Sequence, residues 1–414
     1  MKRVPPHPQR LKHLAFFEVL ASAPEDSAEA RRATAGLLAL RMIDHWVLAG
    51  PAIVEPESVS VRSVRQAIMA MPPTEPVREA LLTIVNTMQM LRHVDLAPVL
   101  PRVFAFGQLL ERHHGEMALA ADAYESVVRL SDTEFDAELM MDGYHRLAFC
   151  QRKTGALDLA EETSKAMAKL AGRRKDRARV LRAKIGLGQV AMMRGQLAKA
   201  DSQFVAVATE AERHELTPEF AMATHNRAVA ASLSGNTTNA VVLAHQALKQ
   251  THDLTERDRV LADLAAFLVK LEAFDAAMDA LRILEVTAST EEPRNSARAN
   301  LIILAGRTGN RMLFEQLRSD FETVHLPVDG RVNLLIECSV ALDEFGDHKA
   351  AEITMRDAEA LAHANGLAGA LEEIHAVRSG TRRNHFVALQ RSRHVPLTEE
   401  VAADLRQMAA AIAA

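Results

Sequence analysis

The chain has 414 residues, of which 48% are hydrophobic, 25% are charged and 4% are aromatic. The apolar fraction is enough for a folded core and excludes a disordered profile, and the scarcity of aromatic residues favours helices over strands. Lys and Arg number 49 against 54 Asp and Glu, a formal charge of −5, so the composition offers no general basic surface for nucleic acid.

Two cysteines, Cys150 and Cys338, stand far apart in the sequence. This spacing predicts buried thiols in a reducing compartment rather than a disulfide framework. No stretch approaches the ~18–20 consecutive apolar residues of a membrane-spanning helix. The sequence therefore predicts a cytoplasmic protein that does not enter a membrane.

Residues 1–97 are predicted to be helical without a regular repeat. The stretch "LAFFEVLASA" loosely imitates a signal peptide, but Glu18 interrupts it and favours an amphipathic first helix. Proline-rich breaks divide four expected helices, at Pro8–Ala21, Glu25–Ala49, Glu57–Met71 and Glu75–His93. We interpret this segment as an N-terminal helical cap or as divergent repeats. The single tryptophan, Trp46, is expected to anchor its core, or alternatively to form a dimer contact.

Residues 98–366 contain a recurring pattern of small residues. Glycines return at intervals of 40 residues, and an alanine follows each of them five residues later; the pairs are Gly115 and Ala120, Gly155 and Ala160, Gly195 and Ala200, Gly235 and Ala240. Beyond these pairs the interval shortens, with Ala273 in the place of the glycine, then Gly309 and Gly346. Helix A usually has another small residue twelve positions before the marked alanine, such as Ala148, Gly188 or Ala228.

This pattern predicts two helices in each unit. The glycine ends the first helix because it adopts the left-handed conformation without a steric penalty. The small residue on the first helix (helix A) and the alanine on the second (helix B) let the two axes approach closely. Neither helix can bury its apolar stripe alone, so successive pairs are expected to stack.

The repeat resembles the tetratricopeptide repeat family, in a long-repeat form found in bacterial regulators. The resemblance covers about seven units and implies an all-α, right-handed α-solenoid of helix hairpins. The early tryptophan and terminal proline of the family pattern are absent. Two units are expected to be degenerate, because Met278 and Phe314 stand where helix B should carry alanine.

Residues 367–414 are predicted to form a basic segment followed by a capping helix. The stretch 375–394 contains no acidic residue and five arginines, Arg378, Arg382, Arg383, Arg391 and Arg393. It is interpreted as a solvated linker or cap face, with contact to an acidic partner as the alternative. Thr398 is expected to be the N-cap of the last helix. A further basic stretch, Gly172–Lys184, is interpreted mainly as a turn between repeats.

No motif for catalysis, metal binding or cofactor binding is present. The sequence lacks H-E-x-x-H, C-x-x-C, G-x-S-x-G and a P-loop. "HHGE", residues 113–116, is interpreted as the end of a helix, where histidine complements the helix dipole. We therefore predict no enzyme activity, no metal and no cofactor.

A ligand-binding groove is expected along the first helices of successive repeats, as the tetratricopeptide resemblance implies. The residues projected to line it are Arg112, Asp142, His145, Phe149, Arg152, Lys153, Arg182, Gln189, Met192, Met222 and His225. Basic residues alternate with methionine and phenylalanine, a mixture that suits a peptide or helix with acidic and apolar residues. The alternative is that these methionines and Phe149 simply fill the interior of the superhelix.

The function predicted from the sequence is a non-catalytic scaffold or adaptor that binds a protein or peptide, acidic in character, in this groove. One alternative is a sensor or regulator whose solenoid responds to a peptide or small ligand and acts through a partner. Another is a structural protein that forms homo-oligomers. Nucleic acid is not expected as a partner, because no DNA-reading motif occurs.

Overall fold

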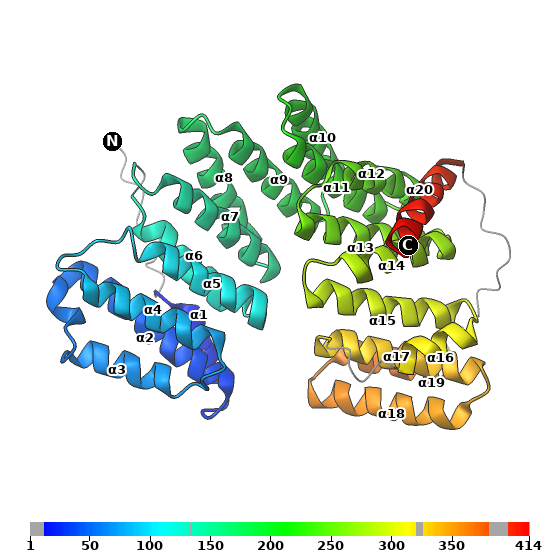
Figure 1. Ribbon diagram of the computed structural model, residues 1–414, viewed down its shortest axis with the longest axis horizontal. Helices are drawn as coiled ribbons and strands as arrows, with labels where there is room; N and C mark the ends of the chain where they lie inside the picture. Colours follow the sequence, from blue (N-terminus) through cyan, green and yellow to red (C-terminus); the bar gives the residue numbers. More distant parts are fainter. Residues whose placement is uncertain (1–11, 133, 320–325, 381–395, 414) are drawn as a thin grey trace. The chain divides into compact units, whose positions relative to one another are not determined.

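The computed structural model describes residues 12–132, 134–319, 326–380 and 396–413, and in this part of the chain every regular element is a helix (Figure 1). The chain divides into two compact units, Met1–Gln196 (unit 1) and Leu197–Ala414 (unit 2). The division falls inside the repeat segment predicted at 98–366. The two units are described separately below.

Unit 1 begins with helices at the four places expected from the sequence. Each starts later than expected, and the start expected at Pro8 lies outside the described residues. Its elements are α1 (Leu14–Ser22), α2 (Ala28–Ala49), the 3-10 helix η1 (Pro51–Val54), α3 (Val59–Met69), α4 (Pro76–Met90), α5 (Leu100–His114), α6 (Met117–Leu130), α7 (Ala137–Lys153), α8 (Leu157–Arg173) and α9 (Arg177–Met193). The hydroxyls of Ser27 and Ser58 accept hydrogen bonds from backbone N–H groups at the starts of α2 and α3, as N-caps do.

Trp46 of α2 is fully buried in the core of unit 1. It packs in one continuous cluster with residues of α1 to α7, including Phe16, Phe106 and Tyr124. The expectation of a core anchor is confirmed, and the alternative of a dimer contact is wrong, because a side chain with no exposed surface cannot reach a second molecule.

Hairpins α5–α6 and α7–α8 follow the predicted repeat. Gly115 and Gly155 end their first helices in the left-handed conformation, with φ of 66° and 77°. Gly107 allows the close approach within the first hairpin, because a Cβ at that position would lie 2.8 Å from Cε1 of Tyr124. The basic stretch 172–184 contains the turn between α8 and α9, where Lys175 has a φ of 58°.

Unit 2 continues the alternation of helices A and B. Its elements are α10 (Leu197–Arg213), α11 (Thr217–Leu233), α12 (Thr237–Gln250), α13 (Leu254–Lys270), α14 (Phe274–Thr287), α15 (Glu291–Arg307), α16 (Arg311–Ser319), α17 (Val328–Glu344), α18 (His348–Ala364), α19 (Ala368–Arg378) and α20 (Pro396–Ala413). Within each unit, the predicted all-α architecture of tetratricopeptide-like helix hairpins is confirmed.

The structure corrects the register of the fifth repeat. The left-handed turn residue is Glu272, with φ 59°, and not Ala273, which caps α14. Counted from Glu272, the alanine of helix B is Ala277, which is fully buried, so this unit is regular. The expectation that Met278 replaces this alanine is therefore wrong. The next unit does depart from the pattern, since buried Phe314 packs against Gly306.

The last helix, α20, does not pack beside its neighbour in sequence. It lies against α12 and α14, the second helices of two successive hairpins (Figure 1). The sequence predicted a helix here, but its place on α12 and α14 differs from a cap at the end of the array. Of the predicted basic stretch, Arg382, Arg383, Arg391 and Arg393 lie outside the described residues, as does the side chain of Thr398.

Candidate functional site

The residues predicted to line a groove fall into both units. Those on α5, α7 and α9 belong to unit 1, whereas Met222 and His225 belong to α11 in unit 2. The two groups are therefore separate sites to be described on their own.

Phe149 is the centre of the group in unit 1. Its ring is half-buried, and three cations lie over it: Cζ of Arg146 at 5.2 Å, Cζ of Arg152 at 5.9 Å and Nζ of Lys153 at 5.8 Å from the ring centroid. We call Phe149 with these three residues the α7 cation cluster. Cations within ~6 Å of an aromatic centroid are attracted to the negative face of the ring. The cluster combines an apolar surface with concentrated positive charge.

A buried acid holds the cluster in place. Glu111 of α5, with a side chain 5% exposed, forms an ion pair with Arg146 and accepts a hydrogen bond from the Tyr124 hydroxyl at 2.8 Å. Burial raises the pKa of Tyr124, so its hydroxyl stays protonated and can donate. Glu111 thus joins α5, α6 and α7. Sequence reasoning omitted both Glu111 and Arg146 because their pairing depends on how α5 and α7 pack.

Gly186 of α9 faces the cluster. A Cβ at Gly186 would lie 3.6 Å from Nη1 of Arg152 and 3.0 Å from Oγ of Ser164. The missing side chain therefore leaves room mainly for the Ser164 hydroxyl of α8, with the Arg152 guanidinium at ordinary contact distance beside it. This explains why "GLGQVA" contains a glycine in the middle of a helix without forming a dinucleotide loop.

The remaining predicted residues of unit 1 lie on α5, α7 and α9 and differ in exposure. Arg112 and Lys153 are exposed, and His145, Arg182, Gln189 and Met192 are half-buried. Asp142 is exposed but engaged, because Oδ1 lies 3.1 Å from Nη2 of Arg179. We refer to this surface as the α5–α7–α9 face.

The two predicted residues of unit 2 have mainly structural contacts. His225 is 5% exposed, and its Nε2 lies 2.8 Å from Oδ2 of Asp263, which joins α11 to α13. Met222 is half-buried, and its backbone carbonyl accepts a hydrogen bond from Nδ2 of Asn226 at 2.7 Å. The prediction that His225 lines the groove stays a prediction; the structure shows its side chain largely buried and paired with Asp263.

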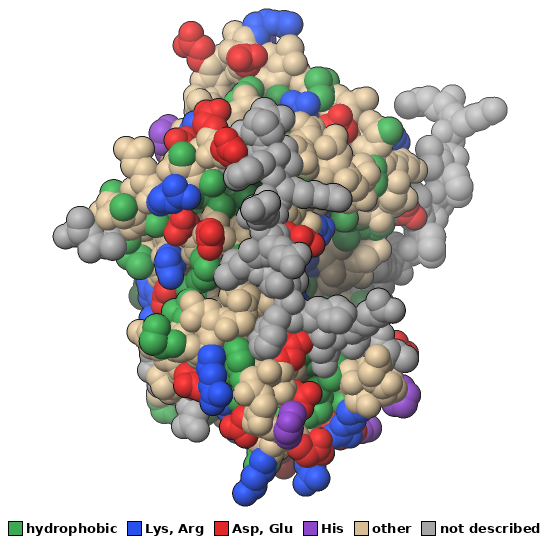
Figure 2. Space-filling model, turned by 90° about the vertical axis from the view of Figure 1, so that its right-hand side faces the viewer, with side chains coloured by type: hydrophobic (Ala, Val, Ile, Leu, Met, Phe, Trp, Pro, Cys, Tyr) green, Lys and Arg blue, Asp and Glu red, His purple; other side chains and the backbone are tan. Residues whose placement is uncertain are grey.

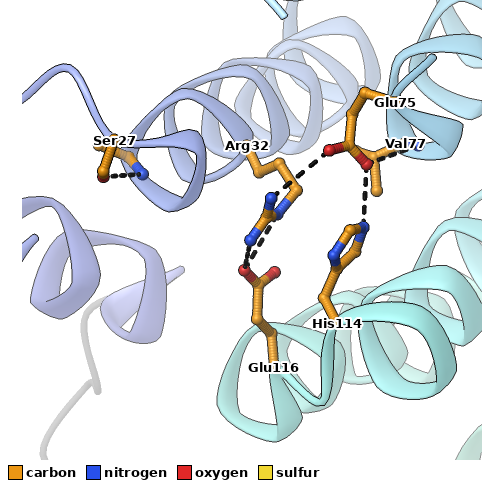
Figure 3. A network of polar contacts seen from close by, with 7 residues as sticks. Ser27, Arg32, Glu75, Val77, His114 and Glu116 are labelled. Carbon is orange, nitrogen blue, oxygen red and sulfur yellow. Dashed lines mark hydrogen bonds and ion pairs between the residues drawn. The ribbon is translucent and has the colours of Figure 1, made fainter. Parts of the chain in front are cut away.

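Sequence reasoning did not detect a polar network around Arg32 in unit 1. Arg32 of α2 pairs with Glu116 at 2.5 Å and with Glu75 at 3.4 Å, and Nε2 of His114 lies 2.9 Å from Glu75 (Figure 3). The four side chains are 11–17% exposed. The "HHGE" stretch thus fastens the α5–α6 turn to α2 and α4, a role beyond the helix-dipole interpretation.

A second buried cluster fastens α1 to the rest of unit 1. Nδ1 of His13 lies 2.7 Å from Oδ1 of Asp122, and its Nε2 lies 3.6 Å from Oδ2 of Asp44. Burial alone would lower the pKa of His13, but the hydrogen bonds and charges of Asp122 and Asp44 outweigh burial and raise it to about 9. His13 is therefore a cation at neutral pH.

Next to this cluster, unit 1 contains a cavity of about 1470 Å³. Its walls come from α1, α2 and α3 on one side and from α6, α7 and α8 on the other. Apolar side chains such as Phe17, Leu38 and Leu147 line it together with Arg41 and Gln151. Sequence reasoning missed this cavity because it is formed between segments far apart in the chain.

Both cysteines are buried and free. Burial raises the pKa of the Cys150 thiol to about 11 and that of Cys338 to about 12. A thiol with so high a pKa is protonated at neutral pH and a poor nucleophile. Among the described residues, no three His, Cys, Asp or Glu side chains are grouped so as to hold a metal ion, and no helix is long and apolar enough to cross a membrane.

On the face shown in Figure 2, the described basic and acidic side chains are interspersed with apolar ones. Charge selectivity on a surface of this kind depends on local clusters, because mixed charges largely cancel at a distance.

Comparisons with solved structures give distant similarities to Rap proteins. The apo form of RapI has 15% sequence identity and a TM-score of 0.43, with 64% of this chain and 99% of that chain covered. The Rap conjugation gene regulator of plasmid pLS20 in complex with the Phr* peptide has 12% identity and a TM-score of 0.47, covering 86% and 98%. A Rap protein complexed with competence and sporulation factor has 12% identity and a TM-score of 0.46, covering 84% and 100%.

No protein-family model matches the chain, and no curated protein matches it. The structural similarities are too low for any functional assignment, so the function proposed for this chain rests on its own residues.

Proposed function

We propose that this protein is a non-catalytic adaptor or regulator that binds a peptide or short helix of a partner protein on the α5–α7–α9 face. The observation that carries the proposal is the α7 cation cluster, in which a half-buried aromatic ring is surrounded by Arg146, Arg152 and Lys153. A cytoplasmic location and homo-oligomer formation remain predictions.

The chemistry of the face defines the partner. Arg112 of α5, Lys153 of α7 and Arg182 of α9 add positive charge to the face, and Asp142 is paired with Arg179. A peptide with carboxylates beside an apolar side chain would be attracted by this positive charge and would cover the ring at the same time. Met192 and the 51%-exposed Met193 of α9 extend the apolar area with flexible side chains that adapt to a ligand.

The experiment is a binding titration with fluorescein-labelled peptides composed of Glu, Asp, Phe and Leu, read by anisotropy. Arg152→Glu with Arg182→Glu should weaken binding at least tenfold. The matched control is Arg62→Glu with Arg173→Glu, which makes the same charge change at exposed positions of α3 and α8. An equal loss of affinity in both double variants would mean that the effect comes from net charge and not from this face. No loss of affinity in either variant would contradict the proposal.

The cavity favours a second candidate, a sensor that responds to a small apolar ligand. Its walls join α1, α2 and α3 to the repeat helices α6, α7 and α8, so a bound molecule would contact both groups. Titration with 1-anilinonaphthalene-8-sulfonate, an anionic dye that fluoresces when its aromatic rings enter an apolar site, tests it. Ala121→Trp, which fills the wall, should abolish dye fluorescence if the dye enters, and unchanged fluorescence would exclude the cavity as its site.

A further inference from the structure

The seat of α20 in unit 2 has the features of a helix-binding surface. The apolar side chains of α20 form a single stripe at helical spacing, with Val401 and Leu405 fully covered and Met408, Ala409 and Ile412 partly covered. They belong to the same apolar cluster as α12, α13 and α14. The opposite side of α20, including Ala403 and Gln407, is exposed. α20 is thus an amphipathic helix laid on an apolar surface.

Charge fixes the position of α20 on this surface. Oδ2 of Asp404 lies 3.1 Å from Nε2 of His245 and 2.8 Å from Nζ of Lys249, both on α12. Glu400, one turn earlier, lies 3.8 Å from the same lysine. His245 is 8% exposed, but Lys249 is 51% exposed and Asp404 is 35% exposed, so both charges of the Lys249–Asp404 pair return to water when α20 leaves.

The route of the chain separates α20 from the element before it. α19 packs on α17 and α18, whereas α20 packs on α12 and α14. Fifteen residues, 381–395, connect the described part ending at Gly380 to α20. Because α20 belongs to the same chain, its docking is intramolecular and needs no second molecule. A competing helix must bind more tightly than this, or act when α20 is weakened.

We propose that the α12–α14 surface is a docking site for an acidic amphipathic helix of a partner protein, and that α20 occupies it as a displaceable internal ligand. The partner helix would carry a carboxylate at the place of Asp404, an apolar residue three positions earlier and another at the next position. This site lies in unit 2 and does not depend on the peptide proposed for unit 1.

The test uses the full chain and a labelled peptide of residues 396–414 as the probe. Leu405→Asp places a charge in the covered stripe and should release α20, so this variant should bind the peptide at least tenfold more tightly than wild type. The matched control, Gln407→Asp, adds the same charge on the exposed side of α20 and should behave as wild type. Circular dichroism and melting establish that both variants are folded.

A charge exchange then tests the site itself. In the Leu405→Asp background, Lys249→Glu should weaken binding of the wild-type peptide at least tenfold. A peptide that carries Asp404→Lys should recover most of that lost affinity. If the folded Leu405→Asp variant binds the peptide no better than wild type, or if Lys249→Glu has no effect, the proposal is wrong. A wild-type chain that dimerises through α20 and loses this association on Leu405→Asp would show exchange between copies and overturn the assignment to a separate partner.

Discussion

In each unit, a helix from outside the repeat pattern packs on the repeat helices through an ion pair. The charged group contributed by this helix is a cation in unit 1 and an anion in unit 2. In unit 1, the cation His13 at the start of α1 lies between Asp44 and Asp122. In unit 2, the anion Asp404 of α20 lies between His245 and Lys249. Both helices lie against the second helix of a repeat hairpin, α6 and α12 respectively.

The difference between them is burial. The side chains of His13 and Asp122 are 3% and 10% exposed. In unit 2, His245 is 8% exposed, but the charged pair Asp404 and Lys249 is 35% and 51% exposed. Breaking a buried ion pair leaves an unpaired charge away from water, but breaking an exposed pair only returns two charges to solvent. One repeat architecture thus supports a permanent attachment in unit 1 and an exchangeable one in unit 2.

The largest effect expected from this comparison is that of Asp122→Ala. It removes one partner of the buried pair and leaves His13 with Asp44 alone, so we expect unit 1 to lose about 3 kcal/mol of unfolding free energy. Urea unfolding followed by the fluorescence of Trp46, which lies in the same core, measures it. A loss below about 1 kcal/mol would mean that the pair is no more than a surface contact.

The pH dependence of unit 1 should follow His13. Its pKa rises from 6.5 in the unfolded chain to about 9 in the folded protein, so the folded state binds the proton more tightly. The contribution to stability is complete below pH 6.5 and is lost as the pH rises toward 9. The urea midpoint of wild type should therefore be higher at about pH 6 than at about pH 9. His13→Gln should remove most of this difference, and an unchanged pH profile in that variant would assign it to other groups.

Substitutions at the turns of the repeats should change stability according to the left-handed backbone conformation of the turn residue. Gly195 has a φ of 74° and open space where a Cβ would lie, so Gly195→Val should destabilise by more than about 1 kcal/mol through backbone strain alone. Glu272 has the same conformation with a side chain, so Glu272→Gly should be neutral or stabilise by up to about 1 kcal/mol. Thermal melting measures both, and a wild-type melting curve for Gly195→Val would contradict the repeat alignment.

The smallest effect is expected at α20. Asp404→Ala should cost less than about 1 kcal/mol of global stability, because Asp404 and its charged partner Lys249 are both open to solvent. Burial and the charge of Lys249 lower the pKa of His245 despite the opposing charges of Asp404 and Glu400. Undocking of α20 removes Asp404 and Glu400 from His245 but leaves Lys249 in place, so the lowered pKa does not by itself set the pH dependence of docking. Thermal melting of Asp404→Ala beside wild type measures the cost, and a loss above about 2 kcal/mol would contradict this ranking.

Much of the repeat is readable from local features. Gly155 and Gly235 are identifiable as turns because only a residue without a side chain adopts a φ near 80° freely, and both have positive φ. The fifth repeat is misregistered from sequence because its turn residue, Glu272, is not a glycine and adopts the same conformation in spite of its side chain. The missing small-residue signal at one position shifts the predicted turn by one residue.

The candidate face was only partly predictable. Phe149, Arg152 and Lys153 follow from helical spacing on α7, and the structure brings them together around one ring. Arg146 and Glu111 were missed, because their pairing joins residues of different helices. The pairing of His225 with Asp263 of α13 was also missed, since helical spacing within α11 cannot show a contact with another helix.

The sequence by itself determined the all-helical class, the position of most turns and the amphipathic character of the last helix, because these depend on residues near one another in the chain. Only the tertiary structure decided that α1 and α20 lie against repeat helices, that His13 is charged and that a cavity lies between α1–α3 and α6–α8. These features depend on pairs of residues far apart in sequence, and the free energy of such pairs is set by burial and distance, which no local pattern specifies.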